Sequence, residues 1–143
     1  MRPLRLILAV LLLAMGGAIY LLYRPHGLLL LRLTDWLGFS GFIEPFRHVL
    51  SPPSPFIVYS FPGGLWASSY ILFVTLIPEA NRTLAAKLFY PSIIPIIGIL
   101  TEMLQGAGFC PGQSDWMDVL CYCVPYVVYS AFILTSYYLQ KWK

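Results

Sequence analysis

The chain has 143 residues, of which 59% are hydrophobic and only 10% are charged, and its formal net charge is +3. Soluble domains carry about 25% charged residues, so this composition excludes an ordinary water-facing surface. The length is that of one domain, and we treat residues 1–143 as a single unit.

The apolar runs are long, continuous and bounded by basic residues, which indicates an integral membrane protein. Backbone within lipid satisfies its hydrogen bonds only in helices or closed barrels, and continuous Leu- and Ile-rich runs favour helices. The predicted fold is therefore all-α, a polytopic membrane protein with an interfacial helix or loop between its first and second spans. The four predicted transmembrane helices cover about residues 5–23, 56–78, 88–105 and 116–139.

The first predicted span follows Arg2 and Arg5 and is a continuous apolar run. A basic start, an apolar centre and small residues also fit a cleavable signal peptide. The run continues through residues 19–23, however, which makes it long enough to cross the membrane, so we expect a retained helix.

The segment between the first and second spans is the least regular. Pro25 and Gly27 should end the first helix. Residues 28–37 are apolar with charges at helical spacing, which predicts a short helix lying in the membrane interface.

Two pairs of opposite charges in this segment are spaced three residues apart. They are Arg32 with Asp35 and Glu44 with Arg47. An ion pair within a helix is worth only about 0.2–0.5 kcal/mol, and that is the ordinary interpretation of both acids. The two arginines are also the cations available to an acidic site on the same side of the membrane.

The second predicted span is interrupted near its start by Pro62, Gly63 and Gly64. A break at this depth is tolerated only where protein or water satisfies the freed backbone groups. The interruption is therefore either a packing point or one wall of a cavity.

One face of the third predicted span carries Gly98, Glu102 and Gln105 at spacings of four and three. Gly98 should let another backbone approach closely on the side that carries the acid. Pro91 and Pro95 should bend this helix.

One side of the fourth predicted span is rich in tyrosine. It consists of Asp118, Tyr122, Tyr126 and Tyr129, with Pro125 at an expected kink.

Basic residues are divided unequally between the two sides of the predicted bundle. Arg2, Arg5, Arg82, Lys87, Lys141 and Lys143 fall on one side, and Arg24, Arg32 and Arg47 fall on the other. The positive-inside rule then places both termini in the cytoplasm and the acidic residues of the last two spans on the opposite side.

Three cysteines do not make a disulfide framework or a metal site. Cys121 and Cys123 lie on different sides of one helix, and Cys110 lies in a loop. No CxxC spacing occurs and no histidine is near, so we expect three ordinary small side chains, no metal and no cofactor.

Asp115 and Asp118 stand at the start of the fourth span. Asp115 can be the N-cap, and Asp118 lies at the third helical position, as in an approximate capping box. The helix dipole favours both charges there. Capping is therefore a full alternative to a functional role.

Glu102 is harder to explain because it lies near the C-terminal end of its helix, where the dipole disfavours an anion by about 0.3–1 kcal/mol. A carboxylate at the membrane boundary should be paired with a cation, protonated or exposed to a water-filled pocket. An acid inside a membrane is a functional-site hypothesis by default.

Together these residues predict one outward-facing polar pocket made from two helix ends and the turn between them. Its candidate functional residues are Glu102, Gln105, Asp115, Asp118 and Tyr122, with Arg32 or Arg47 closing it. Carboxylates, an amide and an arginine suit a polar headgroup, a peptide-like ligand or acid–base chemistry. No Ser-His-Asp or Cys-His arrangement accompanies them, so no catalytic residue is identified.

This stretch resembles the VanZ-like family of small bacterial membrane proteins. The matching positions are Glu102, Gln105, Pro111, Gly112, Asp115 and Asp118. Gln113 and Tyr122 stand where the family has Arg and Asn, and the family's earlier Asp-Lys-x-x-His element has no counterpart in residues 61–66, which indicates a divergent member. The resemblance implies a single VanZ-like transmembrane domain in the bacterial inner membrane, linked to the cell envelope and to resistance against the glycopeptide teicoplanin.

The expected partners are membrane lipids and an envelope lipid or glycopeptide-type ligand, with no nucleic acid. A non-catalytic scaffold, or a small subunit that binds a partner membrane protein or forms an oligomer, is the alternative. An ion-coupled carrier is a third hypothesis, although four spans are few for a transport path.

Overall fold

The computed structural model describes residues 2–25, 29–49, 51, 53–110 and 112–142, and their regular structure is helical, without strands. This confirms the predicted all-α class. The elements are α1 (Arg2–Tyr23), α2 (Leu29–Trp36), α3 (Ser40–Val49), α4 (Pro55–Tyr59), α5 (Phe61–Val74), the 3₁₀ helix η1 (Glu79–Asn81), α6 (Leu84–Gly106) and α7 (Trp116–Lys141). Gly27, Pro111 and Lys143, which the sequence analysis used, lie outside the described residues.

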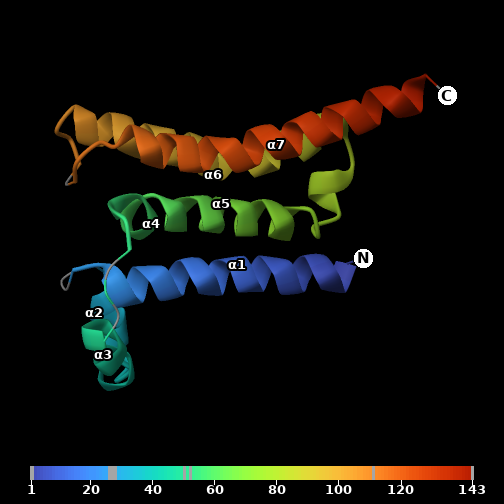
Figure 1. Ribbon diagram of the computed structural model, residues 1–143. Coiled ribbons are helices and arrows are strands. Elements are labelled where there is room, and N and C mark those ends of the chain that lie inside the picture. The colour runs from blue at the N-terminus through green and yellow to red at the C-terminus, as the bar shows by residue number, and fades with distance from the viewer. Residues whose placement is uncertain (1, 26–28, 50, 52, 111, 143) are drawn as a thin grey trace.

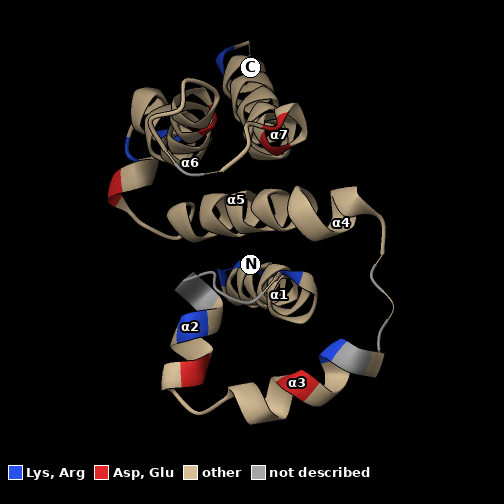
Figure 2. Ribbon diagram, turned by 90° about the vertical axis from the view of Figure 1, so that its left-hand side faces the viewer, with Lys and Arg blue, Asp and Glu red and all other residues tan. Residues whose placement is uncertain are grey.

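The helices α1, α5, α6 and α7 run side by side along the long direction of the molecule (Figure 1). α5 packs against α1 on one side and against α7 and α6 on the other, and α6 packs on α7. Seen along the bundle, α5 forms a middle layer that crosses its neighbours obliquely (Figure 2). α2 and α3 lie across one end of α1 instead of continuing the bundle.

The helix ends meet in two groups. The N-terminus of α1, η1, the start of α6 and the end of α7 lie together at one end (Figure 1). The end of α1, the helices α2 to α4, the end of α6 and the start of α7 lie at the other. We call this second end the loop end.

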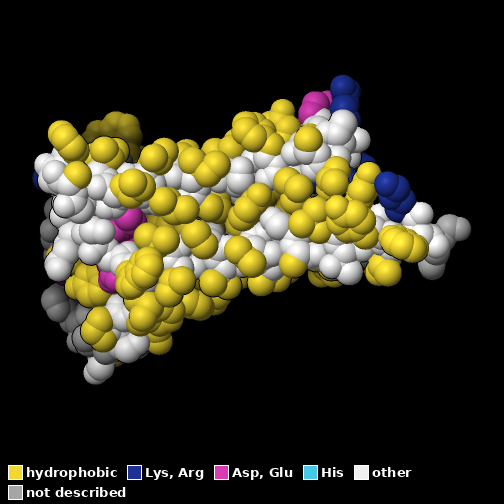
Figure 3. All heavy atoms as spheres, turned by 90° about the horizontal axis from the view of Figure 1, so that it is seen from above, with side chains coloured by type: hydrophobic (Ala, Val, Ile, Leu, Met, Phe, Trp, Pro, Cys, Tyr) yellow, Lys and Arg dark blue, Asp and Glu magenta, His cyan; other side chains and the backbone are white. Residues whose placement is uncertain are grey.

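In the part of the chain that the structure describes, the helices α1, α6 and α7 are long and apolar enough to cross a membrane. Most of their large hydrophobic side chains are exposed, and none of the described residues of α7 is buried. Hydrophobic side chains cover much of the face formed by α6 and α7, and charge gathers at its two ends (Figure 3). The predicted second span is instead two helices, α4 and the 14-residue α5, which meet at Ser60.

Local signals set several of these boundaries. The hydroxyl of Thr83 accepts a hydrogen bond from the Ala86 N–H at 3.0 Å and so caps the start of α6. Gly38 follows α2 and Gly108 follows α6, with φ of 75° and 77°. Both adopt the left-handed conformation that glycine tolerates best, and it ends a helix.

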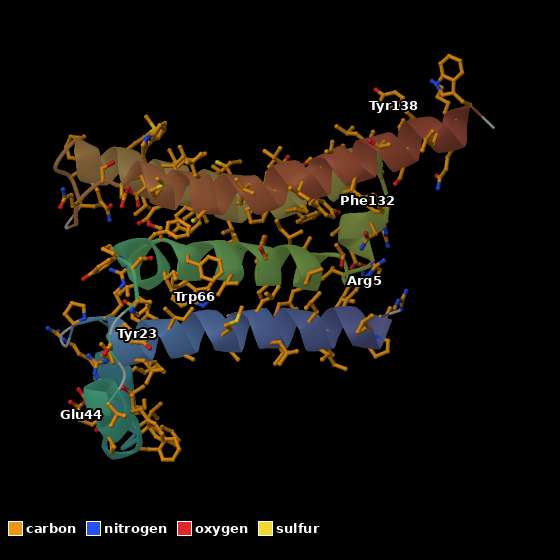
Figure 4. The ribbon with its side chains drawn as sticks, in the orientation of Figure 1. Arg5, Tyr23, Glu44, Trp66, Phe132 and Tyr138 are labelled. Carbon is orange, nitrogen blue, oxygen red and sulfur yellow. The ribbon has the colours of Figure 1, made fainter. Side chains whose placement is uncertain are left out.

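Small residues let α1 and α5 pack closely. Trp66 of α5 points towards α1 (Figure 4), where a Cβ on Gly16 would lie 2.6 Å from its Nε1. The Ser69 hydroxyl donates a buried hydrogen bond of 2.7 Å to the Ala9 carbonyl oxygen. Close backbone approach and interhelical hydrogen bonds are how helices associate in lipid, where hydrophobic burial supplies little.

The ring of Tyr122 fills the space where α5, α6 and α7 meet. A Cβ on Gly98 would lie 2.4 Å from Tyr122 Cδ2, and one on Gly63 would lie 3.0 Å from Tyr122 Cε1. Gly98 therefore admits an aromatic ring, where the sequence analysis expected a neighbouring backbone. Pro62 is fully buried beside Gly63, so this part of the interruption is a packing point.

α6 continues through Pro91 and Pro95, which lack the N–H groups that a helix uses. Tyrosine hydroxyls from the neighbouring helices donate to carbonyl oxygens in this region. Tyr70 of α5 donates to Tyr90 at 2.9 Å, and Tyr126 of α7 donates to Leu88 at 3.3 Å. The tyrosine-rich side predicted for the last helix thus faces α6 at Tyr122 and Tyr126.

We predict that Gly98→Ala destabilises the fold by about 1–3 kcal/mol, because the added methyl group overlaps the Tyr122 ring. Gly17→Ala is the matched control, since a Cβ at Gly17 meets nothing within 4 Å. Thermal unfolding of the detergent-purified protein should show a lower midpoint for Gly98→Ala and no loss for Gly17→Ala. Equal midpoints for the two variants would contradict this packing.

Candidate functional site

A polar cavity of about 690 Å³ opens at the loop end of the bundle. It is lined by Arg24, Pro55, Phe56, Tyr59, Ser60, Gln113, Ser114, Asp115, Met117 and Asp118. These residues come from the end of α1, from α4 and the junction with α5, and from the start of α7. Its volume is typical of ligand pockets, and we call it the polar pocket.

Arg24 supplies the positive charge of the polar pocket. It directly follows α1, and its Nη2 donates to the Tyr59 carbonyl oxygen at 3.0 Å. The guanidinium also lies over the rings of Tyr20 and Tyr59, 5.3 and 4.7 Å from their centroids. Its Nε is buried and has no hydrogen-bond partner among the described residues.

Sequence reasoning did not select Arg24, which it treated only as a flanking charge. A signal was present, because a cation next to the C-terminal end of a helix is favoured by the helix dipole. The aromatic rings that hold the guanidinium could not be foreseen, since Tyr59 is 35 residues away in the chain.

Asp115 and Asp118 lie on the α7 side of the polar pocket. Asp115 is the N-cap of α7, and its Oδ1 accepts from the Met117 N–H at 2.8 Å. Asp118 lies in the first turn, and its Oδ1 is buried without a hydrogen-bond partner among the described residues. No ion pair joins either aspartate to Arg24 within this described part of the chain. The pocket therefore holds opposite charges that do not neutralise each other directly.

Glu102 links α6 to α7. Only 6% of its surface is exposed, and its Oε2 accepts from the Asp115 N–H at 2.8 Å. From the sequence, we expect the Glu102 carboxylate to be paired with a cation, protonated or exposed to a water-filled pocket. The structure supplies a different partner, a backbone donor at the start of the next helix, and Glu102 does not line the polar pocket.

Gln105 and Tyr122 are not among the residues that line the polar pocket. A Cβ on Gly112 would lie 2.6 Å from Gln105 Nε2, so Gln105 packs on the turn between α6 and α7. Gly112 has a φ of 131°, which also favours glycine there. Gln105 and Glu102 thus both contact the turn that carries Asp115.

Arg47 does not line the polar pocket, but it contacts Arg24, which does. It donates through Nη1 to the Leu21 carbonyl oxygen and through Nη2 to that of Arg24, the latter at 2.6 Å. It thus caps the exposed carbonyls at the end of α1, and it also pairs with Glu44 at 3.7 Å, as the ordinary interpretation predicted.

Arg32 is exposed on α2 and is not among the residues that line the polar pocket. In the chain as described it forms no ion pair with Asp35. The place that the sequence analysis gave to Arg32 or Arg47 is therefore taken by Arg24.

An apolar groove of about 420 Å³ adjoins the polar pocket, between α5 and α7. It is lined by Phe56, Phe61, Gly64, Leu65, Ser68, Met117, Leu120, Cys121, Val124 and Pro125. Phe56 and Met117 line both cavities, so the polar pocket and the apolar groove are direct neighbours. Gly64 forms part of this wall, and the interruption in the second predicted span thus serves packing at Gly63 and a cavity at Gly64.

Among the described residues, no group of His, Cys, Asp and Glu could hold a metal ion, and Cys110, Cys121 and Cys123 are free thiols.

No protein-family model, curated protein or solved structure matches this chain. What the site can bind therefore follows from its own side chains. A guanidinium and two carboxylates line the same polar pocket, and an apolar groove adjoins it. This combination suits an amphiphile whose polar part carries charge.

We predict that Glu102→Ala destabilises the protein by about 1–3 kcal/mol, because it removes the buried carboxylate that accepts the part-buried hydrogen bond from the Asp115 N–H. Glu102→Gln should cost less, since its amide oxygen can still accept. Unfolding midpoints and hydrogen exchange of the Asp115 amide should rank the wild type, Gln and Ala variants in that order. Unchanged exchange in the Ala variant would show that this hydrogen bond does not hold the turn.

Proposed function

We propose that this chain is a bacterial inner-membrane protein that binds, or acts on, an envelope lipid or glycopeptide-type molecule at an extracytoplasmic pocket. The observation that carries the proposal is the polar pocket itself. Its lining includes Arg24, Asp115 and Asp118, and it lies at one end of a bundle whose sides are apolar.

The membrane arrangement that we propose has four spans. α1, α6 and α7 are long and apolar enough, and residues 55–74 of α4 and α5 would add a fourth. At about 1.5 Å per residue, those 20 residues reach about 30 Å, the thickness of the hydrocarbon core. α2 and α3, which lie across the bundle end and expose Trp36, Phe42 and Phe46, would rest in the interface.

The charges support an orientation with both termini in the cytoplasm. The end that carries the termini holds Arg2, Arg5, Arg82, Lys87 and Lys141, whereas the loop end holds Arg24, Arg32 and Arg47. By the positive-inside rule the polar pocket then faces away from the cytoplasm, towards the envelope.

The resemblance of residues 102–118 to the VanZ-like family supports the same proposal. It favours a cell-envelope role and a teicoplanin-resistance-like phenotype. Three matching acids have distinct settings: Glu102 holds the turn, Asp115 caps α7, and Asp118 keeps an unpartnered oxygen at the polar pocket.

A scaffold, or a small subunit of an envelope complex, is the second candidate. It is favoured by the large exposed apolar face of α7, where Val128 and Phe132 are 65% and 68% exposed. Such a face suits a neighbouring membrane helix as well as lipid.

We predict that Gln113→Cys, at the exposed rim of the polar pocket, reacts with a membrane-impermeant maleimide in intact spheroplasts. Arg82→Cys, which replaces a side chain 75% exposed at the opposite end, should react only after permeabilisation. Both are made in a background without the three native cysteines. The reverse pattern would turn the pocket towards the cytoplasm and exclude the proposed orientation.

We also predict that Asp118→Asn and Arg24→Gln each abolish most of the difference in teicoplanin or envelope-stress sensitivity between the wild type and a deletion strain. Each removes one charge from the polar pocket, and a hydrogen bond to a charged group is worth about 1.5–3 kcal/mol. Arg32→Gln, outside the pocket, is the control and should behave as the wild type. Membrane abundance is checked by immunoblot in every strain.

Wild-type sensitivity of both pocket variants at normal abundance would count against a ligand site. Loss of abundance in both, together with co-purification of a larger complex with the tagged protein, would favour the scaffold.

A further inference from the structure

We propose that the ligand is a glycerophospholipid with a zwitterionic headgroup, whose phosphate is held at Arg24, whose ammonium is held at Asp118, and whose acyl chain lies in the apolar groove. This inference rests on the proposed function, because it names the class of amphiphile that the polar pocket takes.

The charges of the polar pocket select a headgroup that carries both signs. Arg24 lines the pocket on the α1 side and Asp118 lines it on the α7 side, and each has one buried polar atom, Nε and Oδ1 respectively, without a hydrogen-bond partner among the described residues. A purely anionic headgroup would meet the carboxylates of Asp115 and Asp118, whereas a purely cationic one would leave Arg24 without an anion. A headgroup in which a phosphate is joined to an ammonium can pair with the arginine and with a carboxylate at the same time.

The two aspartates are not equivalent in this respect. The Oδ1 of Asp115 already accepts from the Met117 N–H as the cap of α7. Asp118 has no such bond at its Oδ1, so its carboxylate is the less satisfied of the two, and the ligand ammonium is assigned to it. On the other side, the arginine is held by Tyr59 and the two aromatic rings, and it is therefore preorganised for a phosphate.

The apolar groove accounts for the remainder of a lipid. It begins at Phe56 and Met117, which it shares with the polar pocket, and continues between α5 and α7 to Leu120 and Val124. It thus leads from the charged end of the bundle towards its apolar middle, which is the direction of an acyl chain in a bilayer. A soluble phosphate ester would leave this groove unused, and so would a bulky polar peptide.

The test uses the full-length protein in detergent and measures lipid binding by native mass spectrometry. The probes are phosphatidylethanolamine, phosphatidylglycerol with identical chains, and glycerophosphoethanolamine, which has the same headgroup without chains. We expect phosphatidylethanolamine to bind at least about tenfold more tightly than either of the others, which corresponds to about 1.4 kcal/mol. Comparable binding of the chain-free compound would assign the site to soluble phosphate esters and overturn the lipid.

Variants separate the two halves of the headgroup. Asp118→Asn should lower phosphatidylethanolamine binding to the level of phosphatidylglycerol, Arg24→Gln should weaken both lipids, and Arg32→Gln should change neither. Retained preference in Asp118→Asn would overturn the assignment of the ammonium. N-acetylated phosphatidylethanolamine tests the same contact without altering the protein, and it should bind like phosphatidylglycerol.

The outcomes distinguish this inference from the proposed function. Saturable binding of phosphatidylglycerol or teicoplanin that depends on Arg24, without preference for phosphatidylethanolamine, would overturn the zwitterionic lipid and leave the envelope-ligand function standing. If no pocket variant changes the binding of any amphiphile tested, both the zwitterionic lipid and the envelope-ligand function would be overturned.

Discussion

The structure depends on the hydrogen bond from the Asp115 N–H to the buried carboxylate of Glu102. Its donor is one of the backbone groups that a helix leaves unsatisfied at its start, and its acceptor comes from the end of the preceding helix. This bond fixes where α7 begins relative to α6, and Asp115 in turn caps α7 through Met117. The position of Asp118 beside the polar pocket follows, because it lies one turn into the helix that this bond begins.

Two further contacts bring the other walls of the pocket to the same place. Tyr122 packs against Gly63 of α5 and Gly98 of α6, which sets the three helices at a short separation. Arg47 caps the carbonyls at the end of α1, including that of Arg24, whose own guanidinium reaches the Tyr59 carbonyl. The pocket thus lies where helix ends meet, and side chains from elsewhere satisfy some of their backbone groups: Glu102 at the start of α7, Arg47 at the end of α1 and Arg24 at the end of α4.

The exposed apolar side chains belong largely to helices that are long and apolar enough to cross a membrane. α7 buries none of its described residues, although its length and composition suit a membrane span. In water such a surface would drive aggregation, whereas in lipid it needs no protein cover. Small residues and hydroxyls make several of the close contacts between helices, as at Gly16 and Ser69. The apolar groove lies open beside the polar pocket.

The sequence by itself determined the all-α class, the three long apolar helices and the cap of α7 by Asp115, because these depend on hydrophobic length and on contacts within a few residues. It also indicated that Glu102 needed a partner. Only the tertiary structure decided that this partner is a backbone N–H, that Gly98 faces an aromatic ring, and that Arg24 is the cation of the pocket, in place of Arg32 or Arg47. Those choices join residues 13 to 35 positions apart, so they follow from how the helices pack, which no local pattern specifies.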